Sequence, residues 1–339
     1  VGGEGSDTLV GGAGRDTFLF VGGGEAAGDV IEDLNEGVSE TLLFDKAPDF
    51  LNDLNLDTIT ILPPDGGDAS DYQFIGSAEF ANTNIPQVAY RWDWSPPTNA
   101  TTILIDSNGD GSSDSALKIE GLFFIKEVLG QPGSYYAVKA PNQDQPEVLT
   151  LDFDSAARAP VWLEGARADW SSPANLGDVS PLADDRVKQQ QIVLETQAIF
   201  DASMIPVLVT SIKDGGFAGT GTTVKFSAEA NEDGTSDYRA PSTNDGPFLG
   251  ISNLDRTNDK QIEDVGIFVD SRSAEAIAEL VAHEAGHSYG LRHVNPLPNS
   301  VMDYDEGVPD DHPVFSCLTQ SIYDYDSGTY ETFTHNNIY

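Results

Sequence analysis

The sequence predicts an α+β protein with an N-terminal all-β part, residues 1–140, and a C-terminal part, residues 147–339, in which helices cover a sheet. Short β-branched or aromatic runs separated by Gly, Pro, Asn and Asp fill the first part, as in an all-β module. The segment APNQDQPE, residues 140–147, has two prolines and no apolar side chain larger than alanine, which indicates a boundary. The second part combines strand-like runs with two helical ones, the pattern of a sheet with helices packed on it.

Composition limits the classes of function. The chain has 339 residues, of which 39% are hydrophobic, and 56 acidic against 17 basic side chains give a formal charge of −39. That hydrophobic content can fill real cores. The charge would repel nucleic acids and anionic membranes, so neither is an expected partner. Three explanations of the acidity stay open: a salty medium, the solubility of a secreted protein, and cation binding.

The single cysteine, Cys317, excludes an intramolecular disulfide and a Cys-rich zinc module. No run of 18 apolar residues occurs, so no membrane-spanning helix is predicted. The chain starts at Val1 without a charged-then-apolar leader, so we expect a processed piece of a longer precursor.

The first 20 residues repeat with a period of nine, GGEGSDTLV from Gly2 to Val10 and GGAGRDTFL from Gly11 to Leu19. The glycines permit a tight turn with exposed carbonyls and the aspartate adds a carboxylate, so stacked turns can hold Ca²⁺ between them. The candidate calcium ligands are Gly3, Gly5, Asp7, Gly12, Gly14 and Asp16. The stretch resembles the parallel β-roll of RTX proteins. Because two repeats make little core, we expect further repeats before Val1, or self-assembly.

Three later segments are similar to the C-terminal β-roll and sandwich module of serralysin-type secreted proteases: GDVIEDLNEGVSETLLF (28–44), FIGSAEF (74–80) and TTILIDSNGDGSSDSALKIEGL (101–122). In the last of them, DSNGDGSSD has oxygen-bearing side chains at alternate positions around Gly111, as in a loop that wraps one calcium ion. The candidate ligands are Asp106, Asn108, Asp110 and Asp114. The loop has no glutamate at its twelfth position, so an Asx-rich turn without calcium is an equal alternative.

The second part starts with a strand-like run, VLTLDFD (148–154), and a run with helical apolar spacing, DDRVKQQQIVLETQAIF (184–200). Four strand-like runs follow: IPVLVTS (205–211), TTVKFSA (222–228), PFLGIS (247–252) and VGIFVD (265–270). After Ser273, AEAIAELVAHEAGHSY is rich in Ala, Leu and Glu and predicts a second helix. One sheet, one covering helix and a second helix that carries chemistry are therefore expected.

The segment HEAGHSYGLRH, residues 283–293, contains three of the five histidines. On a helix His283 and His287 lie one turn apart and can bind one metal ion, with Glu284 between them. Gly290 can end the helix in the left-handed conformation, so that His293 approaches from a third direction. Three neutral ligands and an open position for water suit Zn²⁺, and Glu284 is then placed to act as the general base.

This pattern, HExxHxxGxxH, resembles the metzincin zinc-binding signature, and NSVMDYD (299–305) resembles the metzincin Met-turn. The resemblance implies a five-stranded mixed sheet, two main helices and a C-terminal helix. It also implies that Met302 packs beneath the zinc ligands, and that Tyr304 can bind zinc and stabilise the oxyanion. Nine residues from His293 to Met302 is closer to matrixins than to serralysins, and the β module precedes the catalytic part, the inverse of the serralysin order.

Cys317 and the two remaining histidines are not expected to take part in the chemistry. FSCLTQSIYDYD, around Cys317, is expected to form the closing helix with a buried, inert thiol. His312 and His335 have no partners at ligand spacing and are expected at the surface.

These motifs predict a secreted or cell-surface zinc endopeptidase that is stabilised by calcium. Its protein or peptide substrate would bind as an added strand, with PFLGIS as the candidate sheet edge. The alternative is a calcium-dependent structural or adhesive extracellular protein that uses the metzincin fold as a scaffold. The inverted domain order and the acidity favour this alternative.

Overall fold

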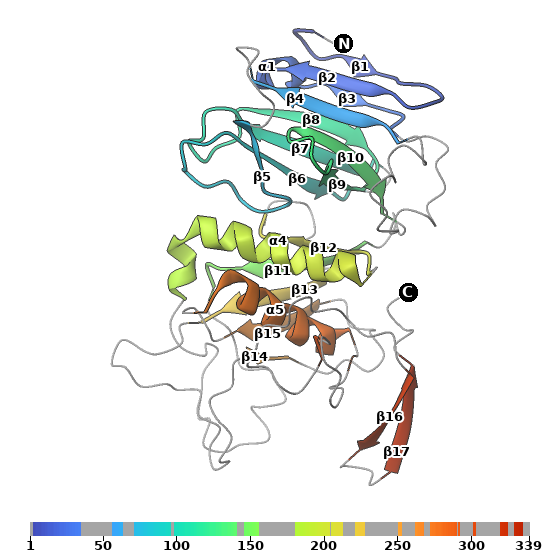
Figure 1. Ribbon diagram of the computed structural model, residues 1–339, viewed down its shortest axis with the longest axis vertical. Coiled ribbons are helices and arrows are strands. Elements are labelled where there is room, and N and C mark those ends of the chain that lie inside the picture. Colours follow the sequence, from blue (N-terminus) through green and yellow to red (C-terminus); the bar gives the residue numbers. More distant parts are fainter. Residues whose placement is uncertain are drawn as a thin grey trace. The chain divides into compact units, whose positions relative to one another are not determined.

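The computed structural model describes residues 3–34, 56–63, 71–95, 98–140, 146–155, 180–203, 205–212, 221–227, 250–252, 262–267, 272–289, 291, 301–302, 319–324 and 329–334. The chain divides into two compact units, Val1–Glu147 with Ile212–Ala218, and Val148–Ser211 with Gly219–Tyr339. Several sheets and few helices make the protein α+β, as predicted (Figure 1). Within the described residues, no helix has both the length and the apolar character needed to cross a membrane.

The first unit contains two sheets. The six-stranded sheet has the order β1 (Thr8–Leu9), β3 (Val30–Ile31), β8 (Ser115–Glu120), β7 (Ala100–Asp106), β6 (Gln87–Asp93), β5 (Gln73–Phe74). The four-stranded sheet has the order β2 (Thr17–Val21), β4 (Thr58–Leu62), β10 (Ser134–Lys139), β9 (Phe123–Glu127), and a short helix, α1, spans Gly23–Ala26. Trp92 of β6 meets Phe124 of β9 with ring centroids 4.9 Å apart, so the two sheets share one core.

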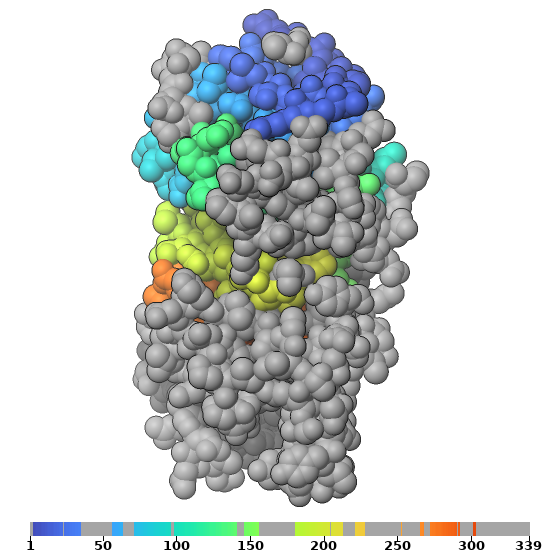
Figure 2. All heavy atoms as spheres, turned by 45° about the vertical axis from the view of Figure 1, so that its right-hand side comes forward, coloured from blue at the N-terminus to red at the C-terminus, as the bar shows by residue number. Residues whose placement is uncertain are grey.

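The two nonapeptide repeats enter different sheets. β1 pairs in parallel with β3, whereas β2 pairs in parallel with β4. Along β2 the side chains alternate, so that Phe18 and Phe20 are buried while Leu19 and Val21 are exposed. Residues of these repeats form part of the continuous blue surface in Figure 2.

The second unit contains a five-stranded mixed sheet. Its order is β12 (Val207–Thr210), β11 (Glu147–Asp152), β13 (Gly221–Phe226), β15 (Ile262–Ile267), β14 (Gly250–Ile251), so each of the five predicted strands is present. β11, β13 and β15 run parallel, and β14 runs antiparallel to β15. Among the described strands β14 is at the sheet edge, where PFLGIS was predicted to lie.

Two helices cover one face of this sheet. α4 spans Arg186–Ala202 and contacts β12, whereas α5 spans Ala274–Ser288 and contacts β13, β14 and β15. The helices also pack directly against each other, which places both on the same face (Figure 1). Buried aliphatic side chains on each helix face this layer, as the helical apolar spacing predicts.

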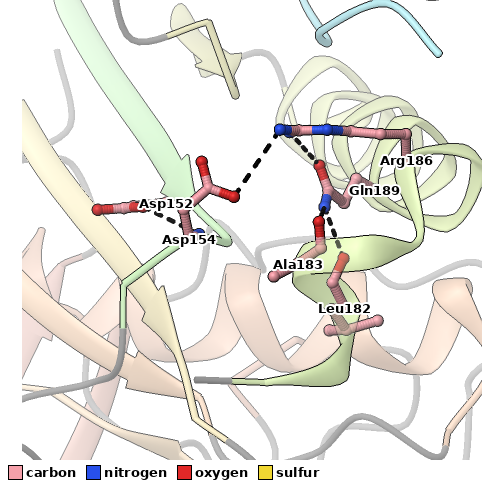
Figure 3. A network of polar contacts seen from close by, with 6 residues as sticks. All are labelled: Asp152, Asp154, Leu182, Ala183, Arg186 and Gln189. Atoms are coloured by element: carbon pink, nitrogen blue, oxygen red, sulfur yellow. Dashed lines mark hydrogen bonds and ion pairs between the residues drawn. The ribbon is translucent and has the colours of Figure 1, made fainter. Parts of the chain in front are cut away.

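A polar network fixes the start of α4 (Figure 3). The amide of Gln189 donates to the carbonyls of Leu182 and Ala183 in the preceding 3-10 helix, Pro181–Asp184. Arg186 donates to the Gln189 side-chain oxygen over 2.8 Å and lies 3.8 Å from Asp154, just after β11. The first turn of α4 is therefore tied to the end of a strand in the sheet.

The predicted closing helix is wrong over Thr319–Asp324. These residues form β16, which pairs antiparallel with β17, Thr329–Thr334. Both segments, TQSIYD and TYETFT, are rich in Thr, Ile, Tyr and Phe, and four residues separate them, which favours a hairpin over a helix. Cys317, His312 and His335 lie outside the described residues.

Candidate metal and catalytic site

The helix α5 begins and ends at well-defined caps. The Ser273 hydroxyl accepts the amide of Ala276, and Glu275 lies in the first turn, where the helix dipole favours a negative charge. The helix ends at Ser288, and the amide of Tyr289 still donates to the Ala285 carbonyl over 3.1 Å. His283, Glu284 and His287 therefore lie on its last two turns, as predicted.

Both helical histidines use Nδ1 to contact a backbone carbonyl. His283 Nδ1 lies 2.6 Å from the Val301 carbonyl oxygen, and His287 Nδ1 lies 2.8 Å from that of Leu291. Because a carbonyl oxygen only accepts, each Nδ1 must carry the hydrogen, and in the neutral ring the lone pair is then on Nε2. Metal-ligating histidines have this second hydrogen bond, which fixes the tautomer and the ring orientation.

The two imidazoles are also close and differently oriented. Their ring centroids are 5.0 Å apart and the ring planes meet at 89°. His283 is 3% exposed and Glu284 is 6% exposed, whereas His287 is only partly buried. Burial lowers the pKa of His283, and the hydrogen bond to Val301 opposes that effect. The neutral, metal-binding form of His283 is therefore favoured.

The segment with the predicted Met-turn returns to this helix. Val301, whose carbonyl accepts from His283, directly precedes Met302, which is 0% exposed. The predicted place of Met302 beneath the zinc ligands stays a prediction. Gly290, His293 and Tyr304 lie outside the described residues. Within the described part of the chain, no three His, Cys, Asp or Glu side chains are grouped to hold a metal, so the third ligand stays a prediction.

The glycine turns of the two repeats have the same backbone conformation. Gly3 and Gly12 have φ values of 90° and 87°, and Gly5 and Gly14 have φ values of 127° and 122°. These positive values are strained for any residue other than glycine. The nine-residue period of the sequence is therefore also a period of the backbone.

Aspartates from elsewhere in the chain bind the amides of these turns. Asp29 Oδ1 accepts the amide of Asp7 over 2.8 Å, and Asp57 Oδ1 accepts that of Asp16 over 2.7 Å. Asp33 accepts the amides of Gly11 and Gly12. Asp29, Asp33 and Asp57 were not among the predicted ligands. The spacing of two aspartates in GDVIED, one on each side of a short strand, was the available signal.

Two carboxylate oxygens beside the turns are buried without a donor. Asp29 is 0% exposed, and neither its Oδ2 nor that of Asp16 has a hydrogen-bond partner among the described residues. A buried carboxylate oxygen is costly unless a donor or a cation compensates it. These oxygens, together with the glycine turns, fit the oxygen ligands that calcium prefers.

The DSNGDGSSD loop is different, because its own amides satisfy its carboxylates. Asp106 accepts the amides of Gly109 and Gly111 over 2.7 and 2.9 Å, and Asp114 Oδ2 accepts the amide of Ser107 over 2.8 Å. These are Asx-type turns, which account for the loop without an ion. Calcium binding by Asp106, Asn108, Asp110 and Asp114 stays a prediction.

No protein-family model and no curated protein sequence matches this chain.

Proposed function

We propose that the second unit is a zinc-dependent endopeptidase. The observation that carries the proposal is the pair of Nδ1 hydrogen bonds, 2.6 and 2.8 Å long, which leave the lone pairs of His283 and His287 on Nε2. Two such rings one helical turn apart, with a buried glutamate between them, suit a metal-assisted hydrolysis. His293 would be the third ligand.

The chain's residues have separate tasks in this proposal. His283, His287 and His293 would hold Zn²⁺, which when bound supplies Lewis acidity that activates a water molecule and polarises a carbonyl. Glu284 takes the proton of the attacking water while the new C–O bond forms. It then passes that proton to the amine as the C–N bond breaks. Tyr304 would donate to the developing oxyanion.

The sheet supports a peptide substrate. β14 is the last strand of its sheet among the described residues, and α5 packs against it. An extended peptide can add to such an edge through main-chain hydrogen bonds, which would align its carbonyls beside the helix that carries Glu284. A five-stranded mixed sheet with two main helices is also what the metzincin resemblance implies.

For the first unit we propose calcium binding at the repeat turns. Each repeat has one supporting observation, because the Oδ2 atom of Asp29 beside the first repeat and that of Asp16 in the second are both buried and lack a donor among the described residues. Calcium would neutralise these carboxylates and stabilise the unit. A calcium-dependent β module fits an extracellular protein, since calcium is abundant there.

The test of the zinc proposal is casein cleavage by purified protein with a measured zinc content. Glu284→Gln should keep zinc and lower kcat/KM by roughly 10²- to 10⁴-fold, because the general base is lost. Glu275→Gln, the same change on the exposed first turn of α5, is the matched control and should cleave normally. Unchanged cleavage by Glu284→Gln with one zinc per chain would refute the mechanism.

Tyr304→Phe tests the oxyanion role. This variant should lower turnover at least several-fold while its zinc affinity is unchanged, since only the phenol hydroxyl is removed. Turnover equal to that of the wild type would exclude the role.

A further inference from the structure

A buried pair of hydroxyls joins the central strand of the sheet to the last residue of α5. Thr222 of β13 and Ser288 are 4% and 1% exposed, and their Oγ atoms are 3.0 Å apart. The Ser288 hydroxyl also lies 2.7 Å from the Ala285 carbonyl oxygen and donates to it. Because a serine hydroxyl has one hydrogen, Thr222 must be the donor to Ser288. The direction of the chain of hydrogen bonds is therefore Thr222 to Ser288 to Ala285.

This pair lies among mostly apolar side chains. On the helix-facing row of β13, Thr222 is followed by Val224 and Phe226, both 0% exposed. On α5 the buried neighbours include Ile277 and Val281. The hydrophobic driving force is not directional, so apolar packing restrains the rotation and axial shift of a helix less sharply than a hydrogen bond does. A hydrogen bond between two buried hydroxyls has a preferred distance and angle and can fix both.

The pair lies next to the proposed catalytic residues. Ser288 directly follows His287, and Glu284 lies one turn earlier on the same side of the helix. His287 is also held by Leu291, whose amide donates to Gly286 over 2.9 Å. A shift of the last turn of α5 would therefore move a proposed zinc ligand and the proposed general base together.

We propose that Thr222 is a positioning residue, which holds the last turn of α5 at the depth and rotation that the reaction of Glu284 and His287 needs. This inference rests on the proposed peptidase function. Catalytic groups lose rate steeply when they are displaced by a fraction of an ångström. The alternative is that the pair only satisfies the hydrogen bonding of two buried hydroxyls. In that case the loss of the pair changes the stability of the protein and leaves the metal site unchanged.

The experiment compares Thr222→Val, Thr222→Ser and Thr196→Val in the full chain with calcium present. Valine keeps the shape of threonine and removes the donor, whereas serine keeps the donor. Thr196 is a similarly buried threonine whose hydroxyl donates to the Ile192 carbonyl within α4, so it controls for the loss of a buried hydroxyl. The readouts are kcat and KM on a peptide, the absorption spectrum of the Co²⁺-substituted protein, and Tm.

Thr222→Val should lower kcat by roughly five- to tenfold with KM within about twofold, and should change the cobalt spectrum. Thr222→Ser should restore kcat to within about twofold, and Thr196→Val should keep both kcat and spectrum whatever its Tm. Ser288→Ala removes the acceptor on the helix and should have the same effect as Thr222→Val. It takes the place of Thr222→Val in the experiment if the Thr222→Val protein does not fold.

Two results would overturn the inference: a wild-type kcat and cobalt spectrum in Thr222→Val or Ser288→Ala, or an equal loss of kcat in Thr196→Val. Failure of the proposed function has a different signature. In that case the wild-type protein itself neither cleaves peptides nor gives a tetrahedral cobalt spectrum.

Discussion

The substitution Asp29→Asn should destabilise the first unit when calcium is present and stabilise it when calcium is removed. Asparagine has the same shape and keeps Oδ1, which accepts the Asp7 amide over 2.8 Å. It removes the negative charge and the Oδ2 oxygen, which is buried without a donor among the described residues. If calcium binds as proposed, the Oδ2 oxygen is a ligand and its loss is unfavourable. Without calcium this oxygen is buried with no donor among the described residues, and its loss is favourable.

The magnitudes follow from the burial of Asp29, which is 0% exposed. An unsatisfied buried polar group costs about 1–3 kcal/mol. The asparagine amide also needs a partner, so the net gain without calcium should be about 1–2 kcal/mol. With calcium, a hundredfold weaker binding would cost about 2.7 kcal/mol. For a unit of this size either change moves Tm by about 2–11 °C, in opposite directions.

The assay is thermal unfolding followed by circular dichroism, with calcium and with a chelator. Asp33→Asn is the control, because both Asp33 oxygens already accept amides, from Gly11 and Gly12. That variant should lose stability under both conditions. If Asp29→Asn is also less stable than the wild type in chelator, the protein itself compensates the Asp29 charge and the calcium assignment at this position is wrong.

Three further predictions concern stability. Burial and the nearby Glu275 raise the pKa of Glu195, so the charged form of Glu195 lowers the stability as the pH rises through that pKa. Glu195→Gln should therefore raise Tm by about 1–2 °C at pH 7, and this gain should vanish in acid. Burial lowers the pKa of His283 below its ordinary 6.5, so the unfolded chain binds more protons than the folded one in acid. The unfolding free energy of the zinc-free protein, measured by denaturant titration, should therefore decrease as the pH falls below 6.5, and it should decrease less in His283→Gln. Gly109 has φ +72°, and an added Cβ would lie 2.4 Å from the Ile85 nitrogen. Gly109→Ala should therefore lower the unfolding free energy by roughly 2–4 kcal/mol. The control Gly130→Ala, where φ is +75° and the space is open, should lower it by about 1 kcal/mol.

The helix α5 could be predicted from the sequence because its determinants are local. The Ser273 cap, the run of Ala, Leu and Glu, and the spacing of His283 and His287 all act within a few residues. The five strands of the second unit could be predicted for the same reason, from short β-branched runs. Their order in the sheet, by contrast, depends on contacts between distant segments.

The residues that could not be predicted make contacts across long stretches of sequence. Asp29 accepts the amide of a residue 22 positions earlier, and Asp57 accepts one 41 positions earlier. The residues of the Thr222–Ser288 pair are 66 positions apart. Neither the threonine nor the serine of this pair has neighbours in the sequence that would predict such a distant partner. The wrong prediction at Thr319–Asp324 has another cause, because its helical reading came from the metzincin resemblance and overrode a local preference for strands.

The two histidines illustrate why a short motif can specify a site whose support is spread along the chain. Their Nδ1 atoms contact backbone carbonyls, at Leu291 and Val301, four and 18 positions further on. A carbonyl accepts in the same way whatever side chain its residue carries, so these contacts constrain the path of the chain and not its residue types. Substitution of Val301 by another apolar residue should therefore preserve the orientation of His283. An insertion between His287 and Val301 should disturb it, because it moves the carbonyl itself.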